Sequence, residues 1–438
     1  MRLSCSVAIL GLIPPAFGQY AGPAILTRGD VPAAMATPQI DFRPFLQLTG
    51  LYDTGLSGVT VNSNGQLADD SSLGVEASGG ISGLHSWRHT KLGLDYRASI
   101  RHYSKVTYYD GTDQSLMLGI AHQLTRHTTL SLREQAGIFT RNFGSLGLLP
   151  TVPFDPVQSY VPTTDFFDNR TLYVSTQADL TIHRSTRLSF DFGGDDFLVR
   201  RRSSALYGER GESARGDVQY RISRHSTIGV AYTFTHFGYT GIFSSTDLHG
   251  TVATFNTRIT RNVELSLYGG VFRAETKFVQ NVPVSPVIAA LLGITTGTAV
   301  IHTIIIAPNA GARVSRTFRS GVLYITGGES ILPGNGLFLT SKTTSLFGGY
   351  SFTGLRRWSF NAGAGYNRSN SIGNVTGTYG GYSGSLSASR RLVASTHLVV
   401  LANASRYQSG DFHNYNRLIY SIRVGLGFTP GDVPLRLW

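Results

Sequence analysis

The side chains best suited to chemistry in this sequence are charged residues that recur at every second position. In the segment KLGLDYRASIR (91–101), Lys91, Asp95, Arg97 and Arg101 share one parity, and mainly apolar residues share the other. Read without regard to spacing, the stretch resembles a basic patch with interleaved aromatic residues, which is typical of nucleic-acid binding. Because successive side chains of a β-strand point to opposite faces, the spacing instead predicts one charged face and one apolar face. The charged face could line a water-filled passage.

The same alternation along the chain gives a larger set of candidate functional residues. Each has the parity opposite to the apolar residues of its own segment, and we predict that all of them line one aqueous lumen: Lys91, Asp95, Arg97, Arg101, Arg133, Asp179, Arg187, Asp191, Arg215, Asp217, Arg221, Arg258, Glu264, Arg313 and Arg423. Basic residues outnumber acidic ones in this set, so the lumen is expected to favour anions. The alternative is that opposed arginines and carboxylates form ion pairs that keep the wall wet and rigid.

Aromatic residues also occur in the lumen-facing parity. Phe139, Tyr173, Phe237, Tyr268 and Phe272 could form a track on which sugar rings stack. The alternative interpretation places them near the rims or packed beneath a loop.

Patterns that carry catalysis or metal binding are absent from the sequence. It contains no G-x-S-x-G, no H-E-x-x-H and no Cys/His metal spacing, and Cys5 is its only cysteine. The histidines lie mostly in polar turns, such as His89, His127 and His225, and the glycines of GNG (334–336) predict a turn. We therefore expect no enzymatic activity, no cofactor and no metal.

The composition excludes several classes of protein. Of the 438 residues, 41% are apolar and only 15% are charged, and the chain has 51 glycines, 24 phenylalanines and 21 tyrosines. Ordinary soluble domains contain about 25% charged residues, and disordered chains hold few aromatics. The most apolar internal run, AVIHTIIIA (299–307), has roughly half of the 18 residues that a membrane-spanning helix needs. The net charge of +12 is compatible with binding to anionic partners, such as nucleic acid, lipopolysaccharide phosphates or anionic solutes.

A short turn containing arginine recurs about every forty residues and sets the elements that position the charges. It appears as WRHT (87–90), TRHT (125–128), HRST (183–186), SRHST (223–227), TRNV (260–263), SRTFRS (315–320), GLRRWS (354–359) and SRRLVAST (389–396). Alternating segments flank these eight turns, and FRPFLQLTGLY (42–52) and NRLIYSIRVGLGF (416–428) add a strand at each end. The sequence therefore predicts an all-β fold, a transmembrane antiparallel up-and-down β-barrel of about 18 strands with short periplasmic turns and longer extracellular loops. A soluble sandwich also alternates, but it rarely has so many long strands.

Domain organisation follows from the ends of the chain. Residues 1–18 have a cation at Arg2, a short apolar stretch and small residues at Ala16 and Gly18, which is the pattern of a cleaved secretory signal peptide. A Pro/Ala-rich periplasmic linker is expected over 19–41, the barrel over 42–428 and a tail over 429–438.

Two long loops and one carboxylate need separate interpretation. Residues 141–170 and 275–303 are expected to be loops that either fold into the lumen or plug its surface. The second contains SPVIAALLG, in which Ser285 as N-cap, Pro286 and Gly293 as a stop predict a short helix. Glu134 falls in the lipid-facing parity between leucine and alanine neighbours, and a bulge or a local register shift is expected to turn it away from lipid.

With these turns, strands and an aromatic residue at the end of the last strand, Phe428, the chain resembles the porin-like β-barrels of Gram-negative outer membranes. The resemblance is architectural, covers the chain from about residue 42 and carries over no functional residue. It implies insertion by the outer-membrane assembly machinery, contact with outer-membrane lipid and lipopolysaccharide, and passive diffusion of small solutes, with no nucleic-acid partner. The alternative function is a non-conducting barrel with a structural, surface-interaction or polysaccharide-export role. The sequence does not set the oligomeric state.

Overall fold

The computed structural model of the chain describes residues 43–54, 71–105, 110–139, 171–202, 206–334, 336, 339–355, 357–372, 377–393, 395–410, 416 and 418–428. The predicted signal peptide, linker and tail lie outside these ranges, and so does the loop expected over 141–170. Within them, no helix has the length and apolar character needed to cross a membrane.

Eighteen strands and one short helix make up the described fold. They are β1 (Arg43–Asp53), β2 (Ser72–Ser86), β3 (Thr90–Tyr103), β4 (Gly111–Thr125), β5 (Thr128–Phe139), β6 (Thr171–His183), β7 (Leu188–Arg201), β8 (Gly208–Arg221), β9 (Ser226–Thr240), β10 (Ser244–Thr260), β11 (Val263–Pro283), α2 (Pro286–Leu292), β12 (Thr296–Phe318), β13 (Gly321–Leu332), β14 (Ser341–Leu355), β15 (Trp358–Ser371), β16 (Thr378–Arg391), β17 (Thr396–Ser409) and β18 (Leu418–Phe428). The predicted strand number is confirmed.

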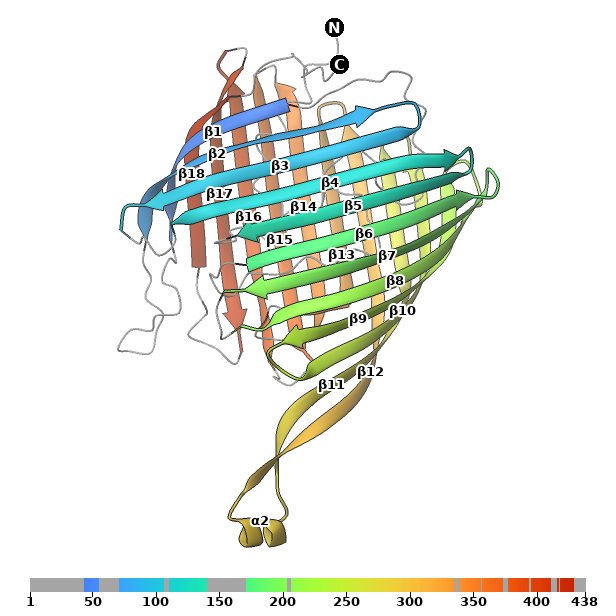
Figure 1. Ribbon diagram of the computed structural model, residues 1–438. Helices are drawn as coiled ribbons and strands as arrows, with labels where there is room; N and C mark the ends of the chain where they lie inside the picture. The colour runs from blue at the N-terminus through green and yellow to red at the C-terminus, as the bar shows by residue number, and fades with distance from the viewer. Residues whose placement is uncertain are drawn as a thin grey trace.

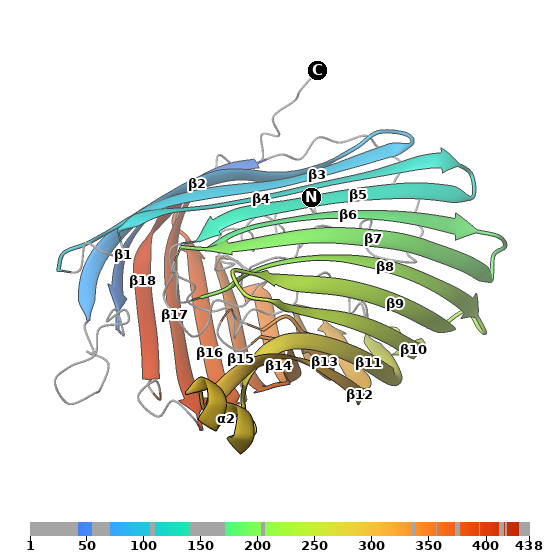
Figure 2. The same ribbon diagram turned by 60° about the horizontal axis from the view of Figure 1, so that its bottom comes forward.

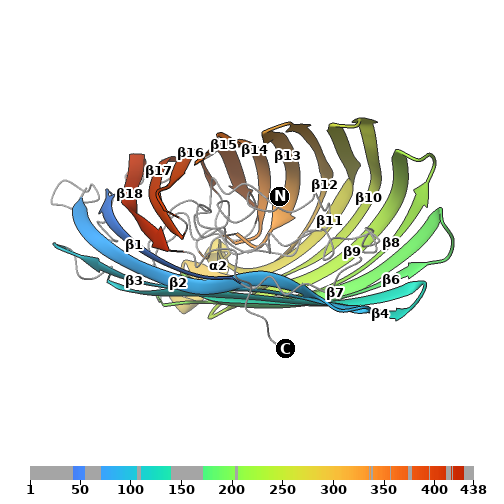
Figure 3. The same ribbon diagram turned by 90° about the horizontal axis from the view of Figure 1, so that it is seen from above.

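The strands form a single closed antiparallel sheet. Each strand pairs with its neighbours in the chain, and β1 also pairs with β18, from Leu46 opposite Phe428 to Asp53 opposite Ser421. The strands cross the front and back of the barrel in opposite slants (Figure 1), and from above they enclose one interior (Figure 3). Around the barrel wall, closure leaves the described strands without a free first or last edge, which is what a strand-built membrane protein requires. The predicted up-and-down barrel is confirmed.

Alternation sorts the side chains as the sequence predicts, with the apolar set outside. On β3, Tyr96 and Ile100 are 37% and 63% exposed, whereas Arg101 on the opposite face is 5% exposed. On β18, Val424 and Leu426 are exposed, and Ser421 is fully buried. A soluble sheet shows the reverse arrangement, since its apolar face is buried. An exposed apolar exterior around a polar interior is the pattern of a barrel that faces lipid outside and water inside.

The eight short arginine turns all connect consecutive strands at one end of the barrel, here named the turn-side rim. A hydroxyl holds several of these turns by accepting the backbone N–H two residues further on: Thr125 from His127, Ser223 from His225 and Thr260 from Asn262. Serine and threonine are frequent in turns because they make this local bond. The opposite end, the loop-side rim, carries the longer connections.

The structure corrects the expectation of a loop over 275–303, because most of this range forms paired strands. Residues 275–283 continue β11, residues 296–303 begin β12, and the two strands pair from Val263 opposite Arg316 to Pro283 opposite Thr296. None of the described strands lies beside the outer part of this hairpin, which extends beyond the loop-side rim with α2 at its tip (Figures 1 and 2). Alternation of the apolar run 299–307 between two faces explains why it forms a strand rather than a plug.

The short helix itself is confirmed at the tip of the hairpin. It begins at Pro286 after Ser285, and Gly293 ends it in the left-handed conformation at φ 67°. Val287 and Leu291 are 70% and 78% exposed. The helix therefore neither enters the lumen nor packs on the barrel.

The structure also corrects the expectation of an irregular strand at Glu134. β5 pairs in unbroken register here, with Glu134 opposite Leu118 of β4 and Thr176 of β6. The side chain lies on the outer face and accepts a hydrogen bond of 2.6 Å from the Thr176 hydroxyl. Local pairing thus keeps a carboxylate on the apolar exterior, where its charge is costly.

Replacing Glu134 with leucine is expected to stabilise the barrel in a bilayer by about 1–2 kcal/mol, because it removes a carboxylate from the lipid face. Urea unfolding in phospholipid vesicles measures this change, and Glu264→Leu, on the inner face, serves as the control without a gain. A loss of stability in Glu134→Leu would contradict the expectation and indicate that the carboxylate has a partner in the membrane.

Candidate functional site: the barrel lumen

Most of the predicted lumen charges lie on the inner face, and the structure joins many of them in ion pairs. Arg97 pairs with Asp95 at 2.9 Å on β3, and Arg258 with Glu264 at 2.8 Å across β10 and β11. The second pair is more than half exposed near the turn-side rim. These contacts favour the ion-pair alternative for the wall, since each arginine charge is balanced by an adjacent carboxylate.

A buried network joins β2, β3 and β4 to the last strand of the barrel, β18. Glu76 of β2 accepts Arg101 of β3 at 2.9 Å and Arg423 of β18 at 3.4 Å, and Arg101 also reaches Asp113 of β4 at 2.9 Å. The side chains of Glu76, Arg101 and Arg423 are at most 10% exposed. Since β1 lies between β2 and β18, the network ties four strands across the line where the barrel closes. It is named the seam network below.

A second network lies on β6, β7 and β8 and is rich in aspartate. Arg215 pairs with Asp179 through its Nε at 3.0 Å, and Gln177 donates to the same aspartate at 2.7 Å. Asp191 and Asp217 face each other across β7 and β8, and both are buried. A Cβ at Gly193 would meet both Asp179 and the Arg215 guanidinium, so glycine leaves the space that this pair occupies.

The remaining predicted lumen residues have other surroundings. Lys91 is half-buried on the inner face of β3. Arg133 donates to the Gln177 amide oxygen at 3.3 Å, and the Arg313 guanidinium lies 5.4 Å from the Tyr324 ring centroid. Arg187 and Arg221 are exposed at the turn-side rim, at the ends of β7 and β8, rather than deep in the lumen.

Sequence reasoning missed several inward charges. Asp53, Glu76, Asp113 and Glu209 face inward, and Glu209 forms a buried pair of 2.9 Å with Arg201. The segments around Glu76 and Glu209 hold few large apolar residues, so their parity gave a weak signal. With these acids included, the acidic side chains on the described inner strand faces come closer in number to the basic ones. The excess of basic residues is therefore smaller than the sequence predicted.

The opposite wall of the lumen is neutral. The described inward positions of β14–β17 hold no charged group except Arg391 and the titratable His397, both next to the turn-side rim. Instead they carry small polar residues, including Ser359, Asn361, Asn367, Ser369, Ser383, Ser385, Ser387, Asn403 and Ser405. Some bond one another, as the Ser359 and Ser389 hydroxyls do at 2.8 Å. The lumen therefore has a charged wall on β1–β8 and β18 and a neutral wall opposite.

A loop for which the sequence predicted only a turn, at GNG, lies inside the lumen. Leu339 and Thr340, between β13 and β14, are both fully buried. Leu339 packs in an apolar cluster with inward side chains of β6, β7 and β9: Tyr173, Phe197, Val199, Phe237 and Tyr239. The Thr340 hydroxyl lies 2.7 Å from that of Thr246 on β10 and 3.2 Å from that of Tyr239. The described residues of 333–340, named the inward loop, thus reach strands across the barrel.

Gly336 fixes the middle of the inward loop. It has φ +87°, which disfavours residues with a Cβ, and a Cβ there would lie 2.5 Å from Arg201 Nε. Its carbonyl accepts the Tyr207 N–H at 2.9 Å. The glycines of GNG therefore serve a turn, as predicted, but the turn docks against the inner wall.

The inward loop also covers two aromatic rings of the predicted sugar-stacking track. Tyr173 and Phe237 lie beneath Leu339 at 2% and 0% exposure, and Phe272 is buried in a second apolar cluster. Tyr268 is half-buried, and the Phe139 side chain lies outside the described residues. Three of the five aromatic rings are thus unavailable for stacking a solute.

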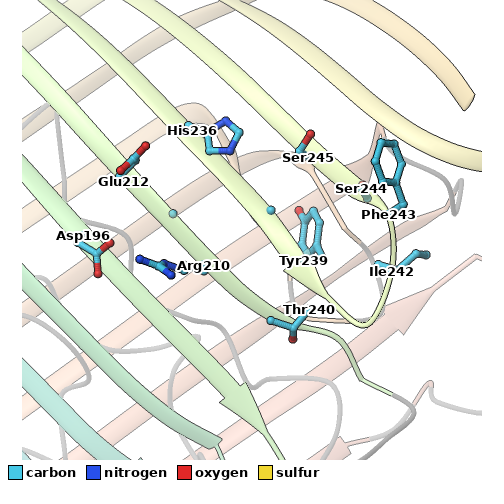
Figure 4. A pocket seen from close by; sticks show the side chains of 12 residues that line it. Asp196, Arg210, Glu212, His236, Tyr239, Thr240, Ile242, Phe243, Ser244 and Ser245 are labelled. Atoms are coloured by element: carbon cyan, nitrogen blue, oxygen red, sulfur yellow. The ribbon is translucent and has the colours of Figure 1, made fainter.

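A hollow of about 430 Å³ lies beside the β9–β10 connection at the loop-side rim. Asp196, Arg210, Glu212 and His236, which have outward parity, line it from adjacent strands β7, β8 and β9 (Figure 4). Tyr239 and Ser244, which have inward parity, also line it, so residues of both faces of the wall bound the hollow. Across the described ranges, no group of three or more His, Cys, Asp and Glu residues could hold a metal ion.

No protein-family model and no curated protein matches this chain. Solved structures with a similar fold include OccAB1 of Acinetobacter baumannii, at 11% identity over 91% of this chain and 100% of that one, with a TM-score of 0.43. The outer membrane protein OpdK of Pseudomonas aeruginosa has 11% identity, coverage of 89% and 98% and a TM-score of 0.41, and the copper transporter OprC has 11%, 90%, 67% and 0.42. At these values, the likeness supports no statement about the solutes or partners of this chain.

Proposed function

We propose that the protein is an outer-membrane channel through which small hydrophilic solutes diffuse passively. The observation that carries this proposal is the sorting of side chains on eighteen strands, with exposed apolar residues outside and polar residues inside. A closed barrel of this size encloses more space than its own side chains fill. The signal-peptide pattern and the apolar exterior support export to the outer membrane, insertion by its assembly machinery and contact with its lipids, including lipopolysaccharide.

The two walls of the lumen support a specific mode of permeation. A solute passing between them would meet paired charges on β1–β8 and neutral hydroxyl and amide groups on β14–β17. Such a passage offers hydrogen bonds on both sides without a large net charge. We therefore propose weak ion selectivity in place of the anion preference that the sequence predicted, with Lys91 as a local contribution toward anions.

The inward loop is proposed to narrow this passage at the loop-side rim. Its buried contacts with the inner faces of β6, β7, β9 and β10 support this proposal. The same observation favours the second candidate, a barrel that the loop keeps closed and that has a structural or polysaccharide-export role.

Conductance of the purified protein in a planar bilayer tests the channel proposal. Discrete ohmic steps with weak selectivity in a salt gradient are expected. A correctly folded barrel that inserts but produces no steps would overturn the channel proposal and favour the closed barrel.

Lys91→Glu is expected to shift the permeability ratio toward cations by about twofold, because it reverses a charge on the inner wall. The reversal potential in a potassium chloride gradient measures this shift. Lys277→Glu makes the same change on the outer face of β11 and should leave the ratio unchanged. An equal ratio in wild type and Lys91→Glu would show that Lys91 does not face the ion path.

A further inference from the structure

The turn-side rim carries a set of exposed arginines that the proposed channel function does not explain. Arg88, Arg126, Arg184, Arg224, Arg261, Arg319 and Arg357 each occupy a different short turn, and all are exposed. The eighth turn follows Arg390 and Arg391, which are also exposed. Within the described residues, none of these arginines takes part in an ion pair. The seven turn arginines, Arg88, Arg126, Arg184, Arg224, Arg261, Arg319 and Arg357, are named the arginine collar.

Turn geometry does not require arginine at these positions. In the turns of Arg126, Arg224 and Arg261, the hydroxyl of the preceding residue accepts the N–H of the following one. The arginine between them contributes only backbone, so any polar residue could replace it without loss of the turn. Its repetition around the rim therefore indicates a role outside the fold.

Two further arginines, at the ends of β12 and β16 next to the collar, face outward beside aromatic rings. The Arg390 guanidinium lies 5.4 Å from the Trp358 ring centroid, and Trp358 stacks on Phe360 at 5.5 Å. Arg316 lies 4.8 Å from Phe318 in the same way. All of them share the parity of the exposed apolar residues. Aromatic rings at the end of an apolar belt mark the level of lipid headgroups.

We infer that the arginine collar, with Arg316 and Arg390, binds the phosphates of anionic phospholipids in the leaflet at the turn-side rim. A guanidinium matches phosphate with two parallel N–H donors, and clustered cations next to a membrane surface attract anionic lipids. The lumen arginines differ, since several are paired with carboxylates, whereas the collar is open to an external anion. This inference rests on the proposed membrane-spanning placement of the barrel.

Trp358 supplies a built-in probe for the test. The chain has three tryptophans, Trp87, Trp358 and Trp438, so Trp87→Phe with Trp438→Phe leaves Trp358 as the single reporter. The full barrel is refolded into vesicles, and quenching of Trp358 is compared for brominated phosphatidylglycerol and brominated phosphatidylcholine. We expect about threefold preference for the anionic lipid, reduced toward equality by high salt.

The variant and its control carry the same number of substitutions. Arg316→Gln, Arg357→Gln and Arg390→Gln together should abolish most of the preference. Arg200→Gln, Arg368→Gln and Arg406→Gln remove three exposed strand arginines of outward parity near the loop-side rim and should leave it intact. Both variants should retain the heat-modifiable gel mobility of a folded barrel.

Equal quenching by the two lipids in the wild type would overturn the inference. Because quenching by either lipid shows insertion, that result would leave the membrane-spanning placement standing. A preference that survives the loss of all three arginines would also overturn it. If the wild type shows no lipid preference but binds soluble polyphosphate through the same arginines, the collar belongs to a soluble anionic partner instead.

Discussion

Replacing Leu339 with aspartate is expected to raise the single-channel conductance of the barrel by about twofold or more. Leu339 is fully buried among Tyr173, Phe197, Val199 and Phe237. An aspartate there would place an unpaired charge in an apolar cluster, which costs several kcal/mol unless the group moves to water. The inward loop is the element free to move, because the barrel strands are held by pairing on both sides. Its release would widen the passage at the loop-side rim.

Val393→Asp is the control for this change. Val393 lies in the turn between β16 and β17 at 62% exposure, so the same new charge enters water without displacing anything. Its conductance should match that of the wild type. An increase in both variants would show that the added charge, rather than release of the loop, changes the current.

Cysteines in place of Thr246 and Thr340 test the position of the loop without relying on conductance. The two hydroxyl oxygens lie 2.7 Å apart, so a disulfide is expected to form between the substituted side chains. Cys5, the only native cysteine, is replaced by serine beforehand. A disulfide together with unchanged conductance in Leu339→Asp would mean that the loop lies inside but does not limit the current.

The elements of the barrel could be predicted because their signals are local. A turn such as Thr125 to Thr128 is held by a hydroxyl within its own residues, and the alternation of Leu418 to Phe428 reports two solvents directly. The number of strands followed from counting these signals. Glu134 shows the limit of the same reasoning: strand pairing on both sides outweighs the cost of one outward carboxylate.

The contacts of the lumen could not be predicted, since they join distant parts of the chain. Arg423 meets Glu76, 347 residues away, and the pairing depends on where the barrel closes. Leu339 meets Phe237 only because the inward loop crosses the barrel. Alternation shows which face a side chain takes, but it does not show which charge lies beside it. The predicted lumen residues on the strands have the inward parity, but their partners, such as Glu76 for Arg101 and Arg423, could not be read from that parity.

Replacing Glu76 with glutamine is expected to lower the free energy of unfolding by about 3–5 kcal/mol, because it leaves Arg101 and Arg423 buried beside a neutral group. Both arginines depend on this carboxylate, at 2.9 Å and 3.4 Å, although Arg101 keeps Asp113. The network spans β18, β2 and β3 across the closing strand β1, so its loss weakens the seam itself. Urea unfolding in vesicles and the temperature at which the folded gel band is lost measure the effect.

Glu264→Gln removes the same charge from an ion pair of similar geometry and is the matched control. Its pair with Arg258 has a distance of 2.8 Å, but the side chains are 57% and 56% exposed, so its loss should cost less than about 1 kcal/mol. Similar losses for the two variants would show that burial does not strengthen the seam network. As a separate test, a double-mutant cycle of Glu76→Gln with Arg101→Gln should give a coupling free energy above about 1 kcal/mol if the network acts as a unit. Because the seam is the place where the two ends of the sheet meet, this coupling measures how far paired lumen charges hold the barrel closed rather than select what passes through it.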